Sequence, residues 1–180
     1  MLFRSPATER VHGQSSSDFP KKSFNLNLVT TAGKSNPLPL LGLGKFDSWI
    51  LNAPWNYDRT LLHNAFVYAL SNRLGRWAPR TQLVEVFVNA DGGDLDYNDY
   101  VGVYMLMDTL DIDSARVDLK SLNPGDTGST SITGGYFLKI DIPDSTELKF
   151  ETKRGYPGQP AFVVVDKPKL ANLATAQRTY

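Results

Sequence analysis

The sequence predicts an α+β fold, a twisted antiparallel sheet that carries one main helix. Several segments alternate between apolar and polar residues or are continuously apolar, as β-strands are. Residues 59–74 have the spacing of a helix, and Gly- and Pro-rich connections separate the apolar segments. The chain has 180 residues, 41% of them hydrophobic, which is enough for one sizeable core or two small ones.

The first predicted strand is "KSFNLNLV", residues 22–29. Phe24, Leu26 and Leu28 alternate with polar residues, the pattern of a half-buried strand. The same alternation places Lys22 on the apolar face. Residues 30–49 are rich in Gly and Pro, and we expect them to form an ordered connection whose leucines point inward.

The predicted helix covers residues 59–74. Asp58 can cap its start, and Gly75 stands where a left-handed residue ends a helix. The residues predicted to form its buried stripe are Leu62, Phe66, Ala69, Leu70 and Leu74.

Further strands are predicted at residues 81–89, 100–107, 134–142 and 161–167. The first two are joined by the acidic, Gly-rich segment 90–99, which makes a long hairpin loop. Asp94, Asp96 and Asn98 have the spacing of calcium ligands, but Asp99 and Met105 stand where an EF-hand requires Gly and Glu. A solvated insertion is the favoured interpretation of residues 91–99, and an irregular calcium site is the alternative.

Composition narrows the possible partners. Lys and Arg number 19, as do Asp and Glu, so no global charge recruits nucleic acid or an anionic membrane. The absence of cysteine excludes disulfides and thiolate metal sites. The sequence contains no apolar run of the length of a signal peptide or a membrane span. Because the last segment begins a helix-like pattern without a cap signal, we expect the chain to be part of a longer protein.

The stretch "HGQSSSDFPKKSF", residues 12–24, is the main candidate binding segment. Gly13 allows close backbone approach, and Ser15 and Ser16 offer donors suited to phosphate oxygens. A lysine on the apolar face needs an anionic partner, because an unpaired buried charge is costly, and this favours Lys22 over Lys21 as the phosphate contact. A solvated serine loop with two surface lysines is the alternative.

The order of elements is that of a protein-kinase small lobe: a Gly/Ser turn, a strand with a lysine, a helix, two strands and a polar segment. Four separated blocks carry a closer resemblance, over residue 10 to the C-terminus. They are "RVHGQSSSDFPKKSFNLNL", "LLHNAFVYALSNRLGRWAPRTQLVEVFVN", "VGVYMLMDTLDIDSARVDL" and "GGYFLKID". Together they resemble the CotH kinase family of spore-coat-type atypical kinases.

The resemblance implies a protein that binds ATP with Mg²⁺ and phosphorylates protein side chains, often in spore-coat, secreted or surface proteins. It implies a small lobe at residues 1–166 and the start of a truncated large lobe at residues 167–180. Kinases take their metal-binding and nucleophile-positioning residues from the large lobe, so no catalytic residue and no metal site is expected within this chain. A non-catalytic pseudokinase or surface-binding module is the alternative.

The resemblance also implies roles for residues outside the opening stretch. Ordinary kinases pair the lysine with a helical glutamate, which the predicted helix lacks. Glu85 could supply this carboxylate instead, or it could be a solvent-side strand residue. Met107 and Asp108 fall in the predicted hinge, residues 105–110, where backbone groups and apolar contact would recognise adenine.

Overall fold

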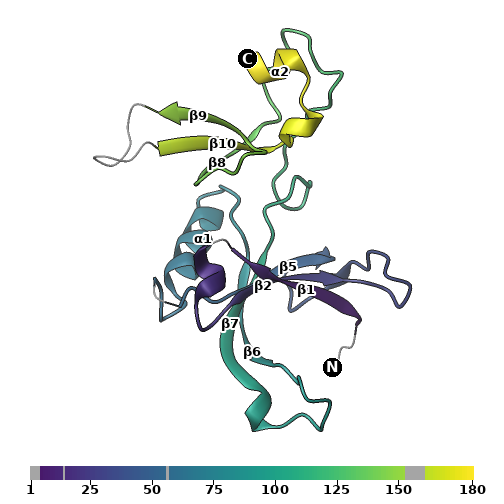
Figure 1. The fold of residues 1–180 in the computed structure, drawn as a ribbon, viewed down its shortest axis with the longest axis vertical. Coiled ribbons are helices and arrows are strands. Elements are labelled where there is room, and N and C mark those ends of the chain that lie inside the picture. The colour runs from purple at the N-terminus through teal and green to yellow at the C-terminus, as the bar shows by residue number, and fades with distance from the viewer. Residues whose placement is uncertain (1–4, 14, 56, 153–160) are drawn as a thin grey trace. The chain divides into compact units, whose positions relative to one another are not determined.

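The computed structural model describes residues 5–13, 15–55, 57–152 and 161–180. Its contacts divide the chain into two compact units, Met1–Asp111 and Ile112–Tyr180. Figure 1 shows that the N-terminal unit contains the larger sheet and the main helix. The predicted division at residues 166 and 167 stays a prediction.

The sheet of unit 1 has five strands in the order β1-β2-β5-β7-β6, and every neighbouring pair is antiparallel. The strands are β1 (Ala7–His12), β2 (Ser23–Leu28), β5 (Ser48–Asn52), β6 (Thr81–Phe87) and β7 (Tyr100–Asp108). Two short strands, β3 (Leu38–Pro39) and β4 (Lys45–Phe46), pair with each other beside it. The predicted α+β class with an antiparallel sheet and one main helix is confirmed.

The core of unit 1 consists of two apolar clusters. One contains Leu28, Leu43, Trp49 and Leu106, all buried. The other contains Ile50, Met105 and Met107, against which Ala65 and Tyr68 of the main helix pack. Successive residues of β5 and β7 therefore enter different clusters, as expected of strands in the middle of a sheet.

The main helix, α1 (His63–Arg73), begins at His63 rather than near residue 59. Asp58 caps it from a distance, because its Oδ2 accepts a hydrogen bond from the His63 amide at 2.8 Å. Its Oδ1 accepts from the Thr60 hydroxyl at 2.6 Å, and Leu61 has a positive φ of 59°. The segment between Asp58 and the helix is therefore a tight turn, not helix.

Gly75 terminates α1, as predicted: it follows the last helical residue, Arg73, and the C-cap residue, Leu74. Gly75 has φ 74°, and its amide donates to the Asn72 carbonyl at 3.1 Å. The Arg76 amide donates to the Ser71 carbonyl at 3.0 Å. These two bonds form a Schellman motif, which satisfies the last carbonyls of the helix.

The predicted buried stripe of α1 is wrong. The face that packs on the sheet contains Ala65 and Tyr68, whereas Phe66 is 67% exposed. The other stripe residues are also exposed: Leu62, Ala69, Leu70 and Leu74. The physical reason is that the tight turn after Asp58 fixes the rotation of the helix, so that a small residue and a tyrosine meet the sheet instead of the leucines.

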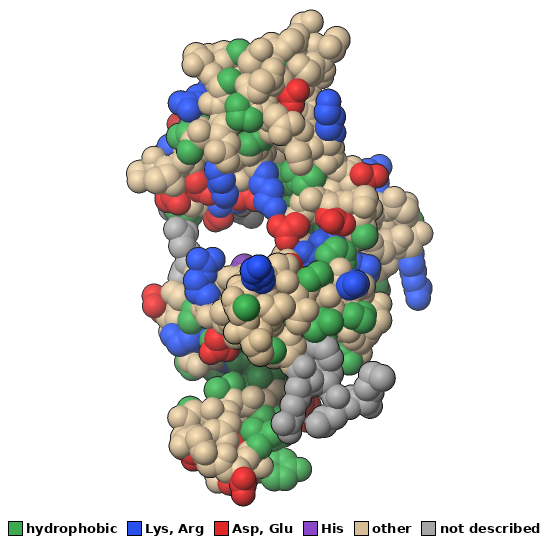
Figure 2. Space-filling view, turned by 90° about the vertical axis from the view of Figure 1, so that its right-hand side faces the viewer, with side chains coloured by type: hydrophobic (Ala, Val, Ile, Leu, Met, Phe, Trp, Pro, Cys, Tyr) green, Lys and Arg blue, Asp and Glu red, His purple; other side chains and the backbone are tan. Residues whose placement is uncertain are grey.

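The hairpin between β6 and β7 projects from the sheet of unit 1, at the lower end of Figure 1. Its loop contains the short 3-10 helix η2 (Tyr97–Asp99). Asp96 and Asp99 form a capping box: the Asp96 carboxylate accepts from the Asn98 amide at 2.7 Å and the Asp99 carboxylate from the Asp96 amide at 2.9 Å. Figure 2 shows acidic and apolar side chains together on this hairpin.

Unit 2 contains a three-stranded antiparallel sheet in the order β8-β10-β9. Its strands are β8 (Phe137–Ile140), β9 (Leu148–Thr152) and β10 (Ala161–Lys167), followed by η3 (Leu170–Asn172) and α2 (Thr175–Thr179). Leu122, Val165 and Leu173 form its core. The buried Gln177 of α2 donates to the Asn123 carbonyl at 2.7 Å, which ties the last helix to the loop before β8.

Within the described ranges, no helix has the length and apolarity needed to cross a membrane.

Candidate anion-binding site

A cavity of about 350 Å³ lies in unit 1 beside the turn that precedes α1. Residues from three segments line it: Lys21 from the segment just before β2, Val103 from β7, and the turn itself. The turn contributes Ala53, Pro54, Trp55, Asp58, Arg59 and Leu61. The cavity thus combines two cationic side chains and an indole ring with one carboxylate.

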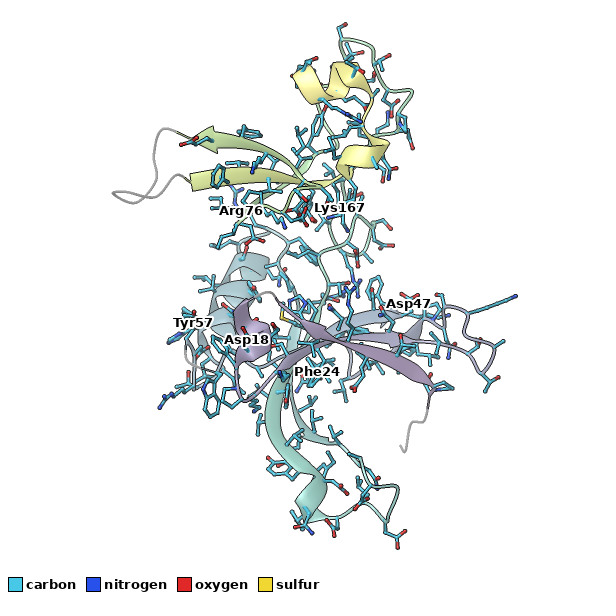
Figure 3. All side chains as sticks on the ribbon, in the orientation of Figure 1. Asp18, Phe24, Asp47, Tyr57, Arg76 and Lys167 are labelled. Atoms are coloured by element: carbon cyan, nitrogen blue, oxygen red, sulfur yellow. The ribbon has the colours of Figure 1, made fainter. Side chains whose placement is uncertain are left out.

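The short 3-10 helix η1 (Ser15–Asp18) lies next to this turn. The ring of Phe19, which follows η1, lies 5.8 Å from the ring of Tyr57. In Figure 3, Asp18 and Tyr57 lie near one another beside α1. The serine-rich segment is therefore a neighbour of the turn that forms the cavity wall.

Lys21 is the partly buried cation of the cavity. Its Nζ donates to the Val103 carbonyl at 2.6 Å and lies 4.5 Å from the centroid of the Tyr104 ring. Burial lowers the pKa of the Lys21 amine. Among the described residues no carboxylate forms an ion pair with it, so its charge is compensated only by a carbonyl dipole and a ring face.

Asp58 is the carboxylate of the cavity wall, and its own turn already uses its oxygens. The hydrogen bond from the Thr60 hydroxyl is the main cause that lowers the pKa of Asp58, and the amide of His63 adds to it. Asp58 therefore stays ionised and holds the turn, while Lys21 and Arg59 supply the positive charge of the cavity.

The predicted burial of Lys22 is wrong. β2 begins at Ser23, so the strand alternation does not extend back to Lys22, and Ser23 is the buried residue instead. The Ser23 hydroxyl accepts a hydrogen bond from the Ala53 amide at 2.8 Å. Lys22 is exposed, and its Nζ donates to the Ser17 carbonyl of η1 at 2.6 Å. The two adjacent lysines therefore point to different surroundings, with Lys21 in the cavity.

Gly13 has the backbone conformation that the sequence pattern predicts for a close approach, with φ 101°. The atom it approaches belongs to the protein: a Cβ at Gly13 would lie 2.0 Å from the Ser16 hydroxyl oxygen. Neither Gly13 nor Ser16 lines the cavity, and the side chain of Ser15 lies outside the described residues. A phosphate contact at Gly13, Ser15, Ser16 or Lys22 stays a prediction.

Glu85 lies on β6 opposite Val103 but faces solvent. Its carboxylate accepts a hydrogen bond from the Tyr100 hydroxyl at 3.2 Å, and burial together with Glu85 raises the pKa of Tyr100. Within the described part of the chain, Glu85 makes no ion pair with Lys21 or Lys22. Its position is that of a solvent-side strand residue, the alternative considered for Glu85.

Met107 and Asp108 lie inside the sheet rather than at the cavity. Met107 is buried between Ile50 of β5 and Thr81 of β6, its partners in register. Asp108 is fully buried, and its carboxylate accepts hydrogen bonds from the Arg80 side chain. Their predicted contact with adenine stays a prediction, and the burial of both side chains argues against a direct one.

Neither a calcium nor a magnesium site is evident in the described residues, which include no group of three or more His, Cys, Asp or Glu side chains that could hold a metal ion. In the 91–99 loop the carboxylates of Asp91, Asp96 and Asp99 accept hydrogen bonds from backbone amides of other residues of the loop. These hydrogen bonds agree with the interpretation of residues 91–99 as a solvated insertion. The alternative, an irregular calcium site, stays a prediction.

The lining residues Trp55 and Arg59 were not singled out from the sequence. Both belong to "APWNYDRT", which has no recognisable motif, and only the turns that precede α1 bring them beside Lys21. The signal available in the sequence was that an aromatic residue, Trp55, and a basic residue, Arg59, lie on either side of the helix-capping Asp58.

The family model described as CotH kinase protein matches residues 10–174, most of the chain. The chain belongs to the CotH kinase family. No curated protein and no solved structure is significantly similar to this CotH family member. The predicted resemblance is confirmed, and the membership supports a kinase-related function.

Proposed function

We propose that this CotH family chain contributes the phosphate-binding lysine of an ATP site, in a kinase that phosphorylates protein side chains, and that Lys21 is this lysine. The observation that carries the proposal is the partly buried Lys21 ammonium, which opens on a cavity and has no ion-pair partner among the described residues. A desolvated cation without a carboxylate favours an anionic ligand.

The other lining groups support a nucleotide as that ligand. Arg59 adds a second positive charge, and guanidinium groups bind phosphate oxygens in pairs of hydrogen bonds. The Trp55 side chain is 40% exposed at the cavity, where its ring could stack on a base. Positive charge and an aromatic surface in one cavity match the two chemical halves of ATP.

Family membership implies Mg²⁺ as the metal that accompanies ATP, but the described residues do not fit it. They contain no group of carboxylate and histidine side chains that could hold a metal ion. No catalytic step through Mg²⁺ is therefore assigned to this chain. The part assigned to Lys21 is to bind and orient phosphate, and the transfer itself needs metal-holding carboxylates that the described residues do not bring together.

The same absence of a metal-binding group favours a second candidate, a non-catalytic pseudokinase or binding module that uses the cavity for an anion. Incubation of the chain with γ-labelled ATP, MgCl₂ and a protein acceptor separates the two. Label in the acceptor supports the kinase, whereas ATP binding without transfer supports the second candidate for the chain by itself.

The experiment that tests the proposal is a nuclear magnetic resonance titration of the full chain with ATP, which detects weak binding. Lys21→Gln should weaken the affinity about ten- to a hundredfold, since a hydrogen bond to a charged group contributes roughly 1.5–3 kcal/mol. Lys22→Gln, one residue away and exposed, is the matched control and should change it less than threefold. Equal behaviour of the two variants would overturn the assignment to Lys21.

A further inference from the structure

Lys21 is held by two neighbouring residues of β7. Its Nζ donates to the Val103 carbonyl at 2.6 Å and stands 4.5 Å from the centre of the Tyr104 ring. Tyr104 is 2% exposed, and its ring also lies 6.3 Å from that of Phe24 on β2. Figure 3 labels Phe24, and β5 separates its strand from β7 in the sheet. The ring under the ammonium is therefore fixed by packing.

Gly102 makes the room for this arrangement. The register between β6 and β7 shifts here: Val86 is opposite Gly102 and Phe87 is opposite Tyr100, so Val101 forms a bulge. Gly102 has φ 106°, and a Cβ at this position would lie 3.1 Å from the Lys21 Nζ. A side chain at residue 102 would therefore strain the backbone and push the ammonium aside by a few tenths of an ångström.

We propose that Tyr104 and Gly102 are positioning residues that hold the Lys21 ammonium toward its anionic ligand without a carboxylate partner. This inference rests on the proposed function of Lys21. A cation facing an aromatic ring is attracted by the negative face of the ring. Unlike a carboxylate, the ring and the carbonyl carry no net charge, so the full positive charge of Lys21 remains for the ligand.

The geometry also explains why the missing helical glutamate is not needed. In an ordinary kinase the carboxylate both orients the lysine and offsets part of its charge. Here the Val103 carbonyl fixes the position of the ammonium through one hydrogen bond, and an ammonium has further N–H groups to donate to phosphate oxygens. Among the described residues, the contacts that orient the Lys21 ammonium come from β7, and α1 contributes no hydrogen bond or ring contact to it.

The test uses the full chain as wild type, Tyr104→Phe, Tyr104→Leu and Gly102→Ala, each titrated with tripolyphosphate and with ATP. Tyr104→Phe keeps the ring and should bind within about twofold of wild type. Tyr104→Leu and Gly102→Ala should each lose about tenfold in affinity, because a lysine side chain that is no longer held in place must be ordered when the ligand binds. Two matched controls should bind as wild type: Tyr97→Leu, at an exposed tyrosine, and Gly92→Ala, at a positive-φ glycine with open space.

A second readout reports positioning directly. The Tyr104 ring should shift the resonances of the Lys21 ε-methylene protons upfield in wild type and in Tyr104→Phe, and the shift should vanish in Tyr104→Leu. The upfield shift also needs no ligand, so it can be measured in every variant that folds.

Failure of the two proposals can be told apart. If wild type binds neither probe, the proposed function of Lys21 is overturned. The positioning roles of Tyr104 and Gly102 then fall as well, because they require an anion bound at Lys21. If wild type binds and both Tyr104→Leu and Gly102→Ala bind equally well, the function stands and the positioning roles are overturned. Should Tyr104→Leu fail to fold, Gly102→Ala against Gly92→Ala decides the question.

Discussion

The Asp108 carboxylate, fully buried in the sheet, accepts two hydrogen bonds from the Arg80 guanidinium, at 2.7 Å from Nε and 3.2 Å from the terminal nitrogen. The Arg80 amide also donates to this carboxylate, at 3.0 Å. Arg80 stands just before β6 and Asp108 at the end of β7, so the pair closes the end of the strand pair opposite its hairpin loop. A residue expected to be a hinge contact is thus the buried half of an ion pair.

Removing Arg80 should destabilise unit 1 strongly. Arg80→Ala removes the guanidinium that donates to the buried Asp108 carboxylate, and breaking a buried ion pair in this way costs about 3–5 kcal/mol. Urea unfolding followed by circular dichroism measures the loss. Glu85→Gln, at an exposed carboxylate on the same strand, should change the free energy of unfolding by less than about 0.5 kcal/mol. Similar midpoints for the two variants would contradict a structural role for the pair.

The packing face of α1 predicts unequal effects of two aromatic substitutions in one helix. Tyr68→Ala should destabilise the protein by about 3 kcal/mol, since Tyr68 packs against the Ile50, Met105 and Met107 cluster. Phe66→Ala should change the stability by only about 0.5 kcal/mol because most of Phe66 is exposed. Thermal unfolding of the two variants checks the order, and a larger loss for Phe66→Ala would support the predicted stripe instead.

The helix cap at Gly75 gives a third prediction. Gly75→Ala places a Cβ on a residue with φ 74°, which costs roughly 1–2 kcal/mol even though nothing lies within 4 Å of the added carbon. Gly75→Asn should recover part of this loss, since asparagine tolerates the left-handed conformation. Gly125→Ala, also in open space but without a positive φ, is the control. Equal stability of Gly75→Ala and Gly125→Ala would show that the Schellman motif contributes little.

Much of the fold followed from local signals. Gly75 marked the end of the helix, and the apolar segments that became β6, β7 and β10 were recognised because their patterns are local. β1 was not predicted, since Ala7–His12 is exposed along most of its length and has no apolar face. β5 was hidden behind a Gly- and Pro-rich connection, although its Trp49 is completely buried.

The site was harder to predict because its contacts are distant in sequence. Lys21 meets Val103 across 82 positions, and Arg80 meets Asp108 across 28. The choice between Lys21 and Lys22 depended on where β2 begins, and a shift of one residue reverses which side chain is buried. Element boundaries are the least certain part of any sequence-based prediction, and here one boundary decided the candidate lysine.

The lowered pKa of Lys21 predicts how ligand affinity depends on pH. Phosphate binding needs the protonated amine, so the affinity for tripolyphosphate should fall as the pH rises through the pKa of Lys21 in the folded protein. Burial lowers this pKa, so the fall should begin at a lower pH than for an ordinary lysine. Titrations from pH 7 to pH 10 measure it, with Lys21→Gln as the reference for all other groups. An affinity difference between wild type and Lys21→Gln that stays constant over this range would contradict the prediction.

The lowered pKa of Lys21 also affects the folding stability, which should change with pH in the opposite direction to the ligand affinity. Because the pKa of Lys21 is lower in the folded state than in the unfolded chain, the unfolded chain binds more protons between the two values, and the contribution of Lys21 to stability rises with pH in that window. Below both values the amine is charged in both states, and the penalty of burying the charge is fully present.

Lys21→Met should therefore be more stable than wild type near pH 7, and this advantage should shrink as the pH rises toward the ordinary pKa of lysine. Urea unfolding of both proteins at pH 7 and pH 10, without ligand, gives the comparison. A difference that grows with pH would mean that the Val103 carbonyl and the Tyr104 ring compensate the charge better than water does.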